Sequence, residues 1–188
     1  MEFLEHSIGV ERNLLLEREQ LIAFVNSRPE WKAGIYDNKV DEKMRKCRTF
    51  SLTQEALTDQ VVAPWDASVR RAFHQGAREY QAQMPFLELT SDEGYFVMRY
   101  TAGDFIEEHS DLAYNTRTVS GVLFLNDEFT GGELVFPQQK IRVKPEPGMG
   151  IFFPSFWNYP HKVDRILSGT RYSITTLFGG NTLTKKKE

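Results

Sequence analysis

The chain has 188 residues, of which 40% are hydrophobic and 26% are charged, and this composition is typical of a globular protein rather than a fibrous or disordered one. Its net charge is −3 and its pI is about 5.9, so no overall positive field attracts a polyanion, and duplex nucleic acid is disfavoured as a partner. A chain of this length buries roughly 70% of its unfolded surface, so it needs no structural metal.

The single cysteine, Cys47, cannot form an internal disulfide, and it excludes a Cys-based zinc finger or an iron–sulfur cluster. Such cysteine usage indicates a reducing compartment. Residues 1–12 show no signal-peptide pattern, and no stretch approaches the roughly 18 apolar residues of a membrane span. We therefore expect a cytoplasmic protein without a membrane partner.

Two helices are predicted in the first half of the chain. Apolar residues recur at three-to-four spacing within residues 13–27 until Pro29 stops the run, and the pattern returns in residues 65–80. Residues 37–48 are dense in charge without an apolar period, which is typical of a solvated loop or an irregular edge. Arg48 in this segment is a weak candidate for substrate binding. We expect helical support over about residues 1–90.

The second half consists of short runs rich in Val, Ile, Phe, Tyr and Thr, separated by Gly, Pro, Asn and Asp, and this pattern predicts strands. Seven strands at this spacing indicate a sandwich or jelly roll with the helices on an outer face. No linker divides the chain, so one domain over residues 1–188 is expected, with its β core at about 91–180. The predicted strands are Gly94–Tyr100, Thr118–Asn126, Glu133–Phe136, Lys140–Val143, Gly150–Phe153, His161–Ile166 and Arg171–Phe178.

Three side chains of the β region can form a metal site. Residues i and i+2 of an extended strand project to the same face, so His109 and Asp111 can reach one ion. His161 begins another predicted strand 50 residues after Asp111, and a jelly roll can bring the two strands together. The other two histidines, His6 and His74, have no partner at metal-ligand spacing, and we expect them to be structural or surface groups.

Two histidines and one carboxylate leave coordination positions open, which suits a non-haem Fe(II) that binds a co-substrate and dioxygen. A 2-oxo acid that chelates the iron can supply electrons by oxidative decarboxylation, and its far carboxylate then needs a cation. Arg171 follows His161 by ten residues, and its planar guanidinium matches a carboxylate. Ser173 shares its strand face and can add a hydroxyl.

These residues resemble the motifs of the Fe(II)/2-oxoglutarate-dependent dioxygenases, within them the prolyl 4-hydroxylase-like branch, over about residues 94–180. The order and gaps of the motifs are more specific than any single motif. The matching pieces are Tyr100-Thr-Ala-Gly103, His109-Ser-Asp111, Leu125-Asn-Asp-Glu-Phe-Thr-Gly-Gly-Glu-Leu-Val-Phe-Pro137, Pro147-Gly148 before Ile151-Phe-Phe153, His161 and Ser168-Gly-Thr-Arg-Tyr-Ser173.

The resemblance implies iron bound by His109, Asp111 and His161, and the 2-oxoglutarate C5 carboxylate bound by Arg171. It also places Tyr100 in the co-substrate pocket. The implied fold is a double-stranded β-helix with N-terminal helices. Two positions depart from the family: animal collagen-type enzymes usually carry Lys at the position of Arg171, and a Tyr that often contacts the co-substrate is Phe124 here.

The implied reaction is hydroxylation of an unactivated C–H bond, with release of succinate and CO2. Family likeness favours a prolyl residue of a peptide or protein, as in a procollagen-proline 4-dioxygenase, and residues 37–48 or 112–117 can clamp an extended chain. Trp157, before the distal histidine, is a candidate for the substrate rim. Ascorbate dependence stays open.

Two other functions stay open. One is a hydroxylase of a free amino acid or small metabolite on the same scaffold. A deep, closed pocket would favour this function. The other is a non-enzymatic jelly-roll binding module. Demethylation of nucleic acid is disfavoured by the acidic balance and by the lack of a basic–aromatic stripe.

Overall fold

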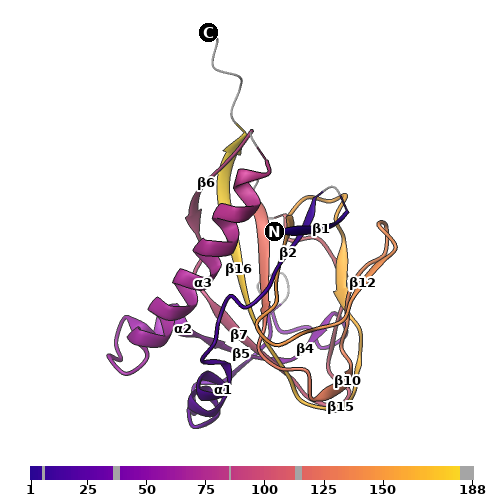
Figure 1. Ribbon diagram of the computed structural model, residues 1–188. Coiled ribbons are helices and arrows are strands. Elements are labelled where there is room, and N and C mark those ends of the chain that lie inside the picture. The colour runs from indigo at the N-terminus through magenta and orange to yellow at the C-terminus, as the bar shows by residue number, and fades with distance from the viewer. Residues whose placement is uncertain (6, 36–38, 85, 113–115, 183–188) are drawn as a thin grey trace.

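The computed structural model describes residues 1–5, 7–35, 39–84, 86–112 and 116–182, and strands predominate in it (Figure 1). Among these residues, no helix has the length and apolar character needed to cross a membrane. In chain order the elements are β1 (Glu2–Glu5), β2 (Ile8–Glu11), α1 (Arg18–Asn26), β3 (Lys32–Ala33), β4 (Arg45–Lys46), β5 (Arg48–Ser51), α2 (Leu52–Ala56), α3 (Ala63–Ala82), β6 (Leu87–Asp92), β7 (Phe96–Tyr100), β8 (Phe105–His109), β9 (Arg117–Phe124), β10 (Phe129–Gly131), β11 (Leu134–Phe136), β12 (Ile141–Val143), β13 (Gly150–Pro154), β14 (His161–Val163), β15 (Ile166–Gly169) and β16 (Arg171–Thr182).

Two antiparallel sheets form the core. The larger sheet has the order β1-β2-β13-β9-β16-β7-β5-β3, with β6 also paired to β16, and the smaller sheet has the order β12-β11-β14-β8-β4. The two sheets lie opposite each other in Figure 1, and one buried cluster contains side chains from both, among them Phe124 and Phe153 of the larger sheet and Leu134 and Phe136 of the smaller one. This arrangement confirms the predicted mainly β, double-stranded β-helix class.

Helix α3 covers the outer face of the larger sheet. Its buried residues include Val69, Phe73, Ala77 and Tyr80, which lie on one face because three- and four-residue steps return to the same side of a helix. The Phe73 ring meets Phe152 of β13 edge-on, with ring centroids 6.3 Å apart. Burial of each such aromatic side chain contributes about 1.5–3 kcal/mol, so this contact fixes the helix against the sheet.

The first half contains more strands than predicted. The expected helical support over residues 1–90 includes β1 to β6, because β2 pairs with β13 and β5 pairs with β7, and such long-range pairing leaves no local helical or strand period. Helix α1 begins at Arg18 rather than near Asn13, whose φ of 59° lies in the left-handed region and cannot start a helix.

The predicted strands of the second half are found with shifted ends, and two strands, β8 and β10, were missed. The prediction of one strand over His161–Ile166 was wrong at its end, because Asp164 and Arg165 separate β14 from β15. Strand β8 was not predicted at all, since two glutamates interrupt its apolar pattern. It is nevertheless the strand that ends at His109.

Candidate metal centre

Strands β8 and β14 bring the two histidines of the predicted site together. His109, the last residue of β8, is the cross-strand partner of His161, the first residue of β14. The next pair is Ile106 with Val163, so three steps on β8 match two on β14, which is a β-bulge. The bulge shifts the alternation of β8 by one residue. Ile106, which is buried, and His109, which is half-buried, therefore both face the space between the sheets.

Asp111 lies two residues beyond the end of β8 and completes the cluster. Its Oδ1 is 3.7 Å from Nε2 of His109, and its Oδ2 is 3.4 Å from Nε2 of His161. One ligand atom from each residue lies within 4.8 Å of the others, which is close enough for a single metal ion. The structure therefore brings together all three predicted metal-binding side chains.

Backbone carbonyls orient both imidazoles. Nδ1 of His109 lies 2.9 Å from the carbonyl oxygen of Glu107, and Nδ1 of His161 lies 3.3 Å from that of Tyr159. A proton on Nδ1 that donates to the carbonyl leaves the lone pair on Nε2, the nitrogen that faces Asp111. The Phe153 ring packs edge-on against His161 at a centroid distance of 4.7 Å and fixes its plane.

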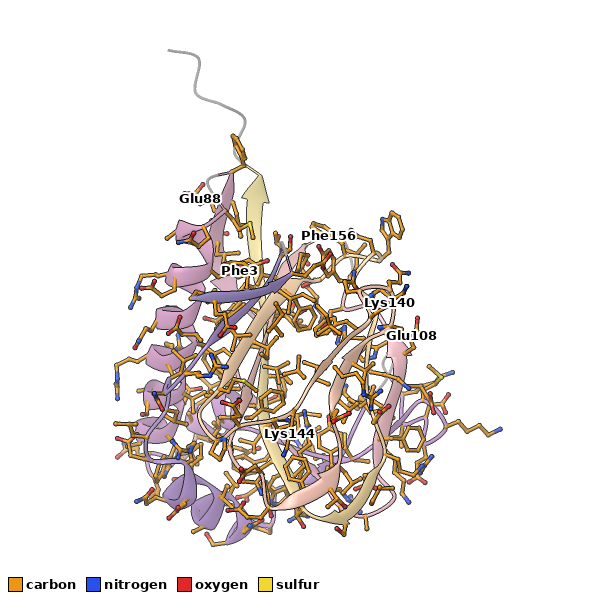
Figure 2. The ribbon with its side chains drawn as sticks, turned by 45° about the vertical axis from the view of Figure 1, so that its right-hand side comes forward. Phe3, Glu88, Glu108, Lys140, Lys144 and Phe156 are labelled. Carbon is orange, nitrogen blue, oxygen red and sulfur yellow. The ribbon has the colours of Figure 1, made fainter. Side chains whose placement is uncertain are left out.

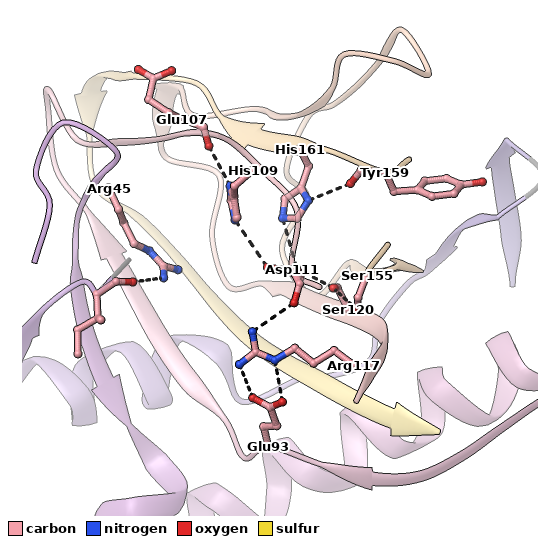
Figure 3. A network of polar contacts seen from close by, with 11 residues as sticks. Arg45, Glu93, Glu107, His109, Asp111, Arg117, Ser120, Ser155, Tyr159 and His161 are labelled. Carbon is pink, nitrogen blue, oxygen red and sulfur yellow. Dashed lines mark hydrogen bonds and ion pairs between the residues drawn. The ribbon is translucent and has the colours of Figure 1, made fainter. Parts of the chain in front are cut away.

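Different residues hold the carboxylate and the backbone of Asp111 (Figure 3). The Ser120 hydroxyl donates to Oδ2 of Asp111 at 2.6 Å, and the Ser155 hydroxyl lies 2.9 Å from that of Ser120. Arg117 donates to the Asp111 carbonyl at 3.2 Å while it forms a two-pronged ion pair with Glu93 at 2.7 and 2.6 Å. The carboxylate orientation is thus set by β9 and β13, and the backbone position by β9.

The charge states of the cluster suit metal binding. Burial, followed by the proximity of His161, lowers the pKa of His109 to about 4, so its imidazole is neutral at pH 7. Burial alone would raise the pKa of Asp111, but the two histidines and the Ser120 hydrogen bond more than offset this and lower it overall. The cluster therefore offers a carboxylate and a neutral imidazole without first having to release protons.

Arg171, at the start of β16, is 1% exposed and lies between the sheets. Its NH1 group donates to the Ser173 hydroxyl at 3.0 Å, and its guanidinium lies 4.9 Å from the ring centroid of Tyr100 and 5.1 Å from that of Phe124. Its buried Nε has no hydrogen-bond partner, and no carboxylate of the described residues forms an ion pair with it. Burial lowers the pKa of this guanidinium.

The residues present fit a metal ion with an anionic co-substrate. Two imidazoles and one carboxylate form the donor set that suits non-haem Fe(II) with open positions. A buried cation without a carboxylate partner is costly, and the orphaned Nε of Arg171 can donate to an anionic ligand that enters the space between the sheets. Tyr100 and Ser173, both buried, adjoin this guanidinium as predicted.

Two weaker candidates lie away from the metal cluster. Trp157 lies in the segment between β13 and β14 and is 73% exposed, so it has the accessibility of a rim residue but no described contact with the cluster. Arg48 pairs with Arg99 across β5 and β7, and both line a cavity of about 470 Å³ whose lining includes none of the three metal-binding residues. The structure therefore does not bring Arg48 to the site.

The two segments proposed as substrate clamps are only partly described. Residues 36–38 and 113–115 fall outside the described part of the chain. The described part of the charged segment contains β4, whose Arg45 pairs with Ile106 of β8. β4 is the last strand of the smaller sheet, so this part of the segment is an edge, one of the two structures predicted for it.

Sequence reasoning missed the hydroxyl pair Ser120 and Ser155 that supports Asp111. Such serines have no local signature: Ser120 lies on β9 and Ser155 directly after β13, and only the pairing of these two strands places them beside the carboxylate. The sequence also gave no sign that Arg45 pairs with the buried Ile106 of β8.

Comparison with known proteins agrees with this geometry. The family model described as "2OG-Fe(II) oxygenase superfamily" matches residues 95–179, the stretch that carries the metal cluster and Arg171. This match covers 85 of the 188 residues. The structure is also similar to a prolyl-4-hydroxylase from Pseudomonas putida, with 26% identity, coverage of 93% of each chain and a TM-score of 0.66. Both comparisons support a 2OG-Fe(II) oxygenase of the prolyl-hydroxylase-like branch.

Two further likenesses define how far the match extends. A prolyl hydroxylase from Trichoplax adhaerens has the same fold, with a TM-score of 0.75, 16% identity and coverage of 93% of this chain and 84% of that one. Human prolyl 3-hydroxylase 2 is 34% identical over 71 residues, which are 35% of this chain and 10% of that protein. The match thus spans about a tenth of the length of this curated relative.

Proposed function

We propose that this protein is an Fe(II)- and 2-oxoglutarate-dependent dioxygenase that hydroxylates an unactivated C–H bond of a prolyl residue in a peptide or protein. The main support for this function is a combination of two features. His109, Asp111 and His161 form one cluster, and the buried Arg171 has no carboxylate partner among the described residues. A metal site alone has many uses. A metal site beside an unsatisfied buried cation fits a metal-chelating, anionic co-substrate.

In this assignment His109, Asp111 and His161 hold the iron, and Arg171 binds the distal carboxylate of 2-oxoglutarate with help from Ser173 and Tyr100. The bound iron and co-substrate supply the oxidising chemistry: the co-substrate becomes succinate and CO2, one oxygen atom of O2 enters succinate, and the other becomes the product hydroxyl. The protein supplies positions, charge and exclusion of water.

The chain's own groups have distinct tasks. Arg171 orients the co-substrate because a guanidinium grips a carboxylate in one plane. The Ser120 hydroxyl holds Oδ2 of Asp111 at 2.6 Å and keeps the carboxylate turned toward the histidines. The rings of Tyr100 and Phe124 cover Arg171 and exclude water from the cation, which strengthens its attraction for an anion.

A peptide substrate is supported by relatives. The Trichoplax adhaerens enzyme is in complex with a peptide fragment of a hypoxia inducible factor oxygen degradation domain. Two relatives differ in the carbon that their names give, C4 for the Pseudomonas putida protein and C3 for the human one. We propose C4, because the likeness to the former covers 93% of each chain. Trp157 is our candidate for a contact at the substrate rim.

Three further statements complete the proposal. We propose that residues 1–188 act as one catalytic domain, because α3 packs on the sheet that carries Arg171 and N-terminal strands are part of that sheet. The lone, buried Cys47 favours a reducing, cytoplasmic location. Ascorbate is a candidate reductant to keep the iron ferrous.

The first test is an anaerobic titration of the metal-free protein with Fe(II) and 2-oxoglutarate, followed by the visible charge-transfer absorbance of the chelated co-substrate. We expect a band that requires both components and is absent in Asp111→Asn. Glu108→Gln changes an exposed neighbour of His109 and serves as the control. A folded wild-type protein without the band would rule out the oxygenase and leave a jelly-roll binding module.

The second test identifies the substrate class. Succinate release is measured with proline-containing peptides, free proline and other free amino acids under identical conditions, and the product is analysed for 3- and 4-hydroxyproline. We expect release coupled to 4-hydroxyproline in a peptide. Coupling to a free amino acid instead would establish the small-metabolite hydroxylase.

A further inference from the structure

Arg45 is a second cation that faces the interior of the β core. It is the cross-strand partner of Ile106, and directly opposed residues of adjacent strands project to the same side of a sheet. Ile106 belongs to the buried cluster between the sheets, together with Cys47, two residues beyond Arg45. Lys46, between them, has a side chain that is 49% exposed and faces outward. The alternation therefore directs Arg45 inward.

The Arg45 guanidinium is only partly satisfied. Its NH1 group donates to the Ile35 carbonyl at 2.9 Å, while its buried Nε has no hydrogen-bond partner. Burial lowers the pKa of Arg45, but Tyr100, Cys47 and Asp111 more than offset this, and the pKa is raised overall. The group is thus a fixed positive charge with a free donor, within the electrostatic reach of the metal-binding carboxylate.

Tyr100 lies between the two cations. Its ring is 4.9 Å from the Arg171 guanidinium, and its hydroxyl interacts with Arg45 as well as with Arg171. Burial raises the pKa of Tyr100 to about 12, so the phenol is neutral at pH 7 and balances neither charge. Asp111, the acid that acts on Arg45, already faces both histidines. Arg45 and Arg171 are therefore two cations that both adjoin Tyr100.

Two cations match a dianionic ligand. 2-Oxoglutarate carries two carboxylates, and Arg171 can grip the distal one. The other carboxylate adjoins the keto group and lies at the metal end of the ligand, and Arg45 lies on the His109 side of the metal cluster (Figure 3). We propose that Arg45 binds the carboxylate next to the keto group of the co-substrate, so that a residue of β4 completes the site. This inference rests on the proposed function.

The backbone around Arg45 fits such a role. A Cβ added to Gly34 would lie 2.5 Å from Sγ of Cys47 and 3.3 Å from Cδ of Arg45. Gly34 also donates to the Cys47 carbonyl at 2.9 Å, which ties the preceding segment to β4. The close packing fixes the Arg45 stem, and a fixed guanidinium loses little entropy when it binds a carboxylate.

The test measures binding rather than turnover. Calorimetry with the protein loaded with redox-inert Zn(II) gives dissociation constants for 2-oxoglutarate and for oxalate, which chelates a metal ion but has no distal carboxylate. We expect Arg45→Gln to weaken both ligands about tenfold or more and Arg45→Lys to restore part of the loss. Arg171→Gln should weaken 2-oxoglutarate far more than oxalate, and Lys46→Gln should change neither.

Each remaining outcome overturns a specific statement. If the dissociation constants of Arg45→Gln for both ligands stay within twofold of wild type, the assignment of Arg45 is wrong. It is also wrong if the affinity falls for 2-oxoglutarate but not for oxalate. Zn(II) affinity and thermal unfolding of each variant, measured without co-substrate, separate misfolding from lost contacts, and Arg45→Lys carries the test if Arg45→Gln does not fold. A metal-loaded wild type that fails to bind 2-oxoglutarate overturns the proposed function itself.

Discussion

His109 and His161 are direct cross-strand partners between β8 and β14, and their imidazole ring centroids lie 4.4 Å apart. The pairing places one histidine at the end of a strand and the other at the start of its neighbour. Glu108, the exposed neighbour of His109, lies on β8 at the surface of the core (Figure 2). Backbone pairing therefore holds the two imidazoles side by side.

Asp111→Asn should abolish tight metal binding while the fold is kept. The amide cannot supply the negative charge, and its nitrogen would face a donor, because the Ser120 hydroxyl already points at Oδ2. We expect Fe(II) or Mn(II) affinity to fall by about 100-fold or more, measured anaerobically by calorimetry. Glu108→Gln should bind like wild type. Unchanged affinity in Asp111→Asn would contradict the assigned ligand set.

Ser120→Ala should weaken metal binding about tenfold or more, because it removes the hydrogen bond that orients the Asp111 carboxylate. Ser155 touches only the Ser120 hydroxyl among these groups, so Ser155→Ala should have a smaller effect. The same calorimetric titration compares the two. Equal losses in both variants would mean that the hydroxyl chain, rather than the single Ser120 contact, orients the carboxylate.

Arg171→Lys should bind 2-oxoglutarate more weakly than wild type but more tightly than Arg171→Gln. The ammonium keeps the charge and loses the planar, two-pronged geometry, whereas the amide loses both. We expect about a tenfold rise in the dissociation constant for the lysine variant and a larger rise for the glutamine variant. Lys144→Gln, which changes an exposed residue after β12, is the control. A weakened Lys144→Gln would show that the loss of a distant surface charge is enough to lower the affinity.

Asp92 should stabilise the fold in a pH-dependent way. Its carboxylate accepts hydrogen bonds from Tyr95 OH and Gly94 N at 3.0 Å and contacts His74 Nε2 at 2.9 Å. Burial opposes the charged form, but these contacts prevail and lower the pKa of Asp92. A lowered folded-state pKa contributes stability above the unfolded value of about 3.9, and this contribution is lost as pH falls through the folded pKa.

Asp92→Asn should therefore lose about 1–2 kcal/mol at pH 7 and show a flatter fall in stability below about pH 4 than wild type. Urea unfolding between pH 3 and pH 7 measures both quantities. Parallel stability curves for the two proteins, separated by a constant amount at every pH, would show that the ionised carboxylate is not the source of the stabilisation.

Gly76→Ala should destabilise the protein through overpacking. Gly76 lies on the buried face of α3, and an added Cβ would overlap the ring of Phe152. A rigid aromatic ring in a packed core cannot yield easily, so we expect a loss of about 1–3 kcal/mol in thermal or urea unfolding.

The matched control for this variant is Gly103→Ala. Nothing lies within 4 Å of a Cβ at Gly103, and its φ of +88° imposes backbone strain alone. Strain of this kind costs about 1–2 kcal/mol, and metal affinity should stay unchanged in both variants. A Gly76→Ala variant as stable as wild type would mean that α3 can shift on its sheet.

Most of the metal site could be predicted from the chain because its parts carry local signals. His109-Ser-Asp111 has the spacing of a shared face, and Arg171 follows a Ser-Gly-Thr turn at a fixed distance from His161. Strand β8 ends at His109, however, and the residues after it bring Asp111 to the two histidines. The helix α3 and most C-terminal strands were likewise encoded by residue periodicity.

The sequence by itself therefore determined the class of fold and indicated the cluster of two histidines and one aspartate and the buried Arg171, because periodicity, turn residues and motif spacing are local properties. The tertiary structure alone decided what supports them. Ser120 and Ser155 meet only because β9 and β13 pair, and Arg45 faces the cavity only because β4 pairs with β8. Register between strands distant in the chain is set by the packing of the whole core, and no short stretch of sequence contains it.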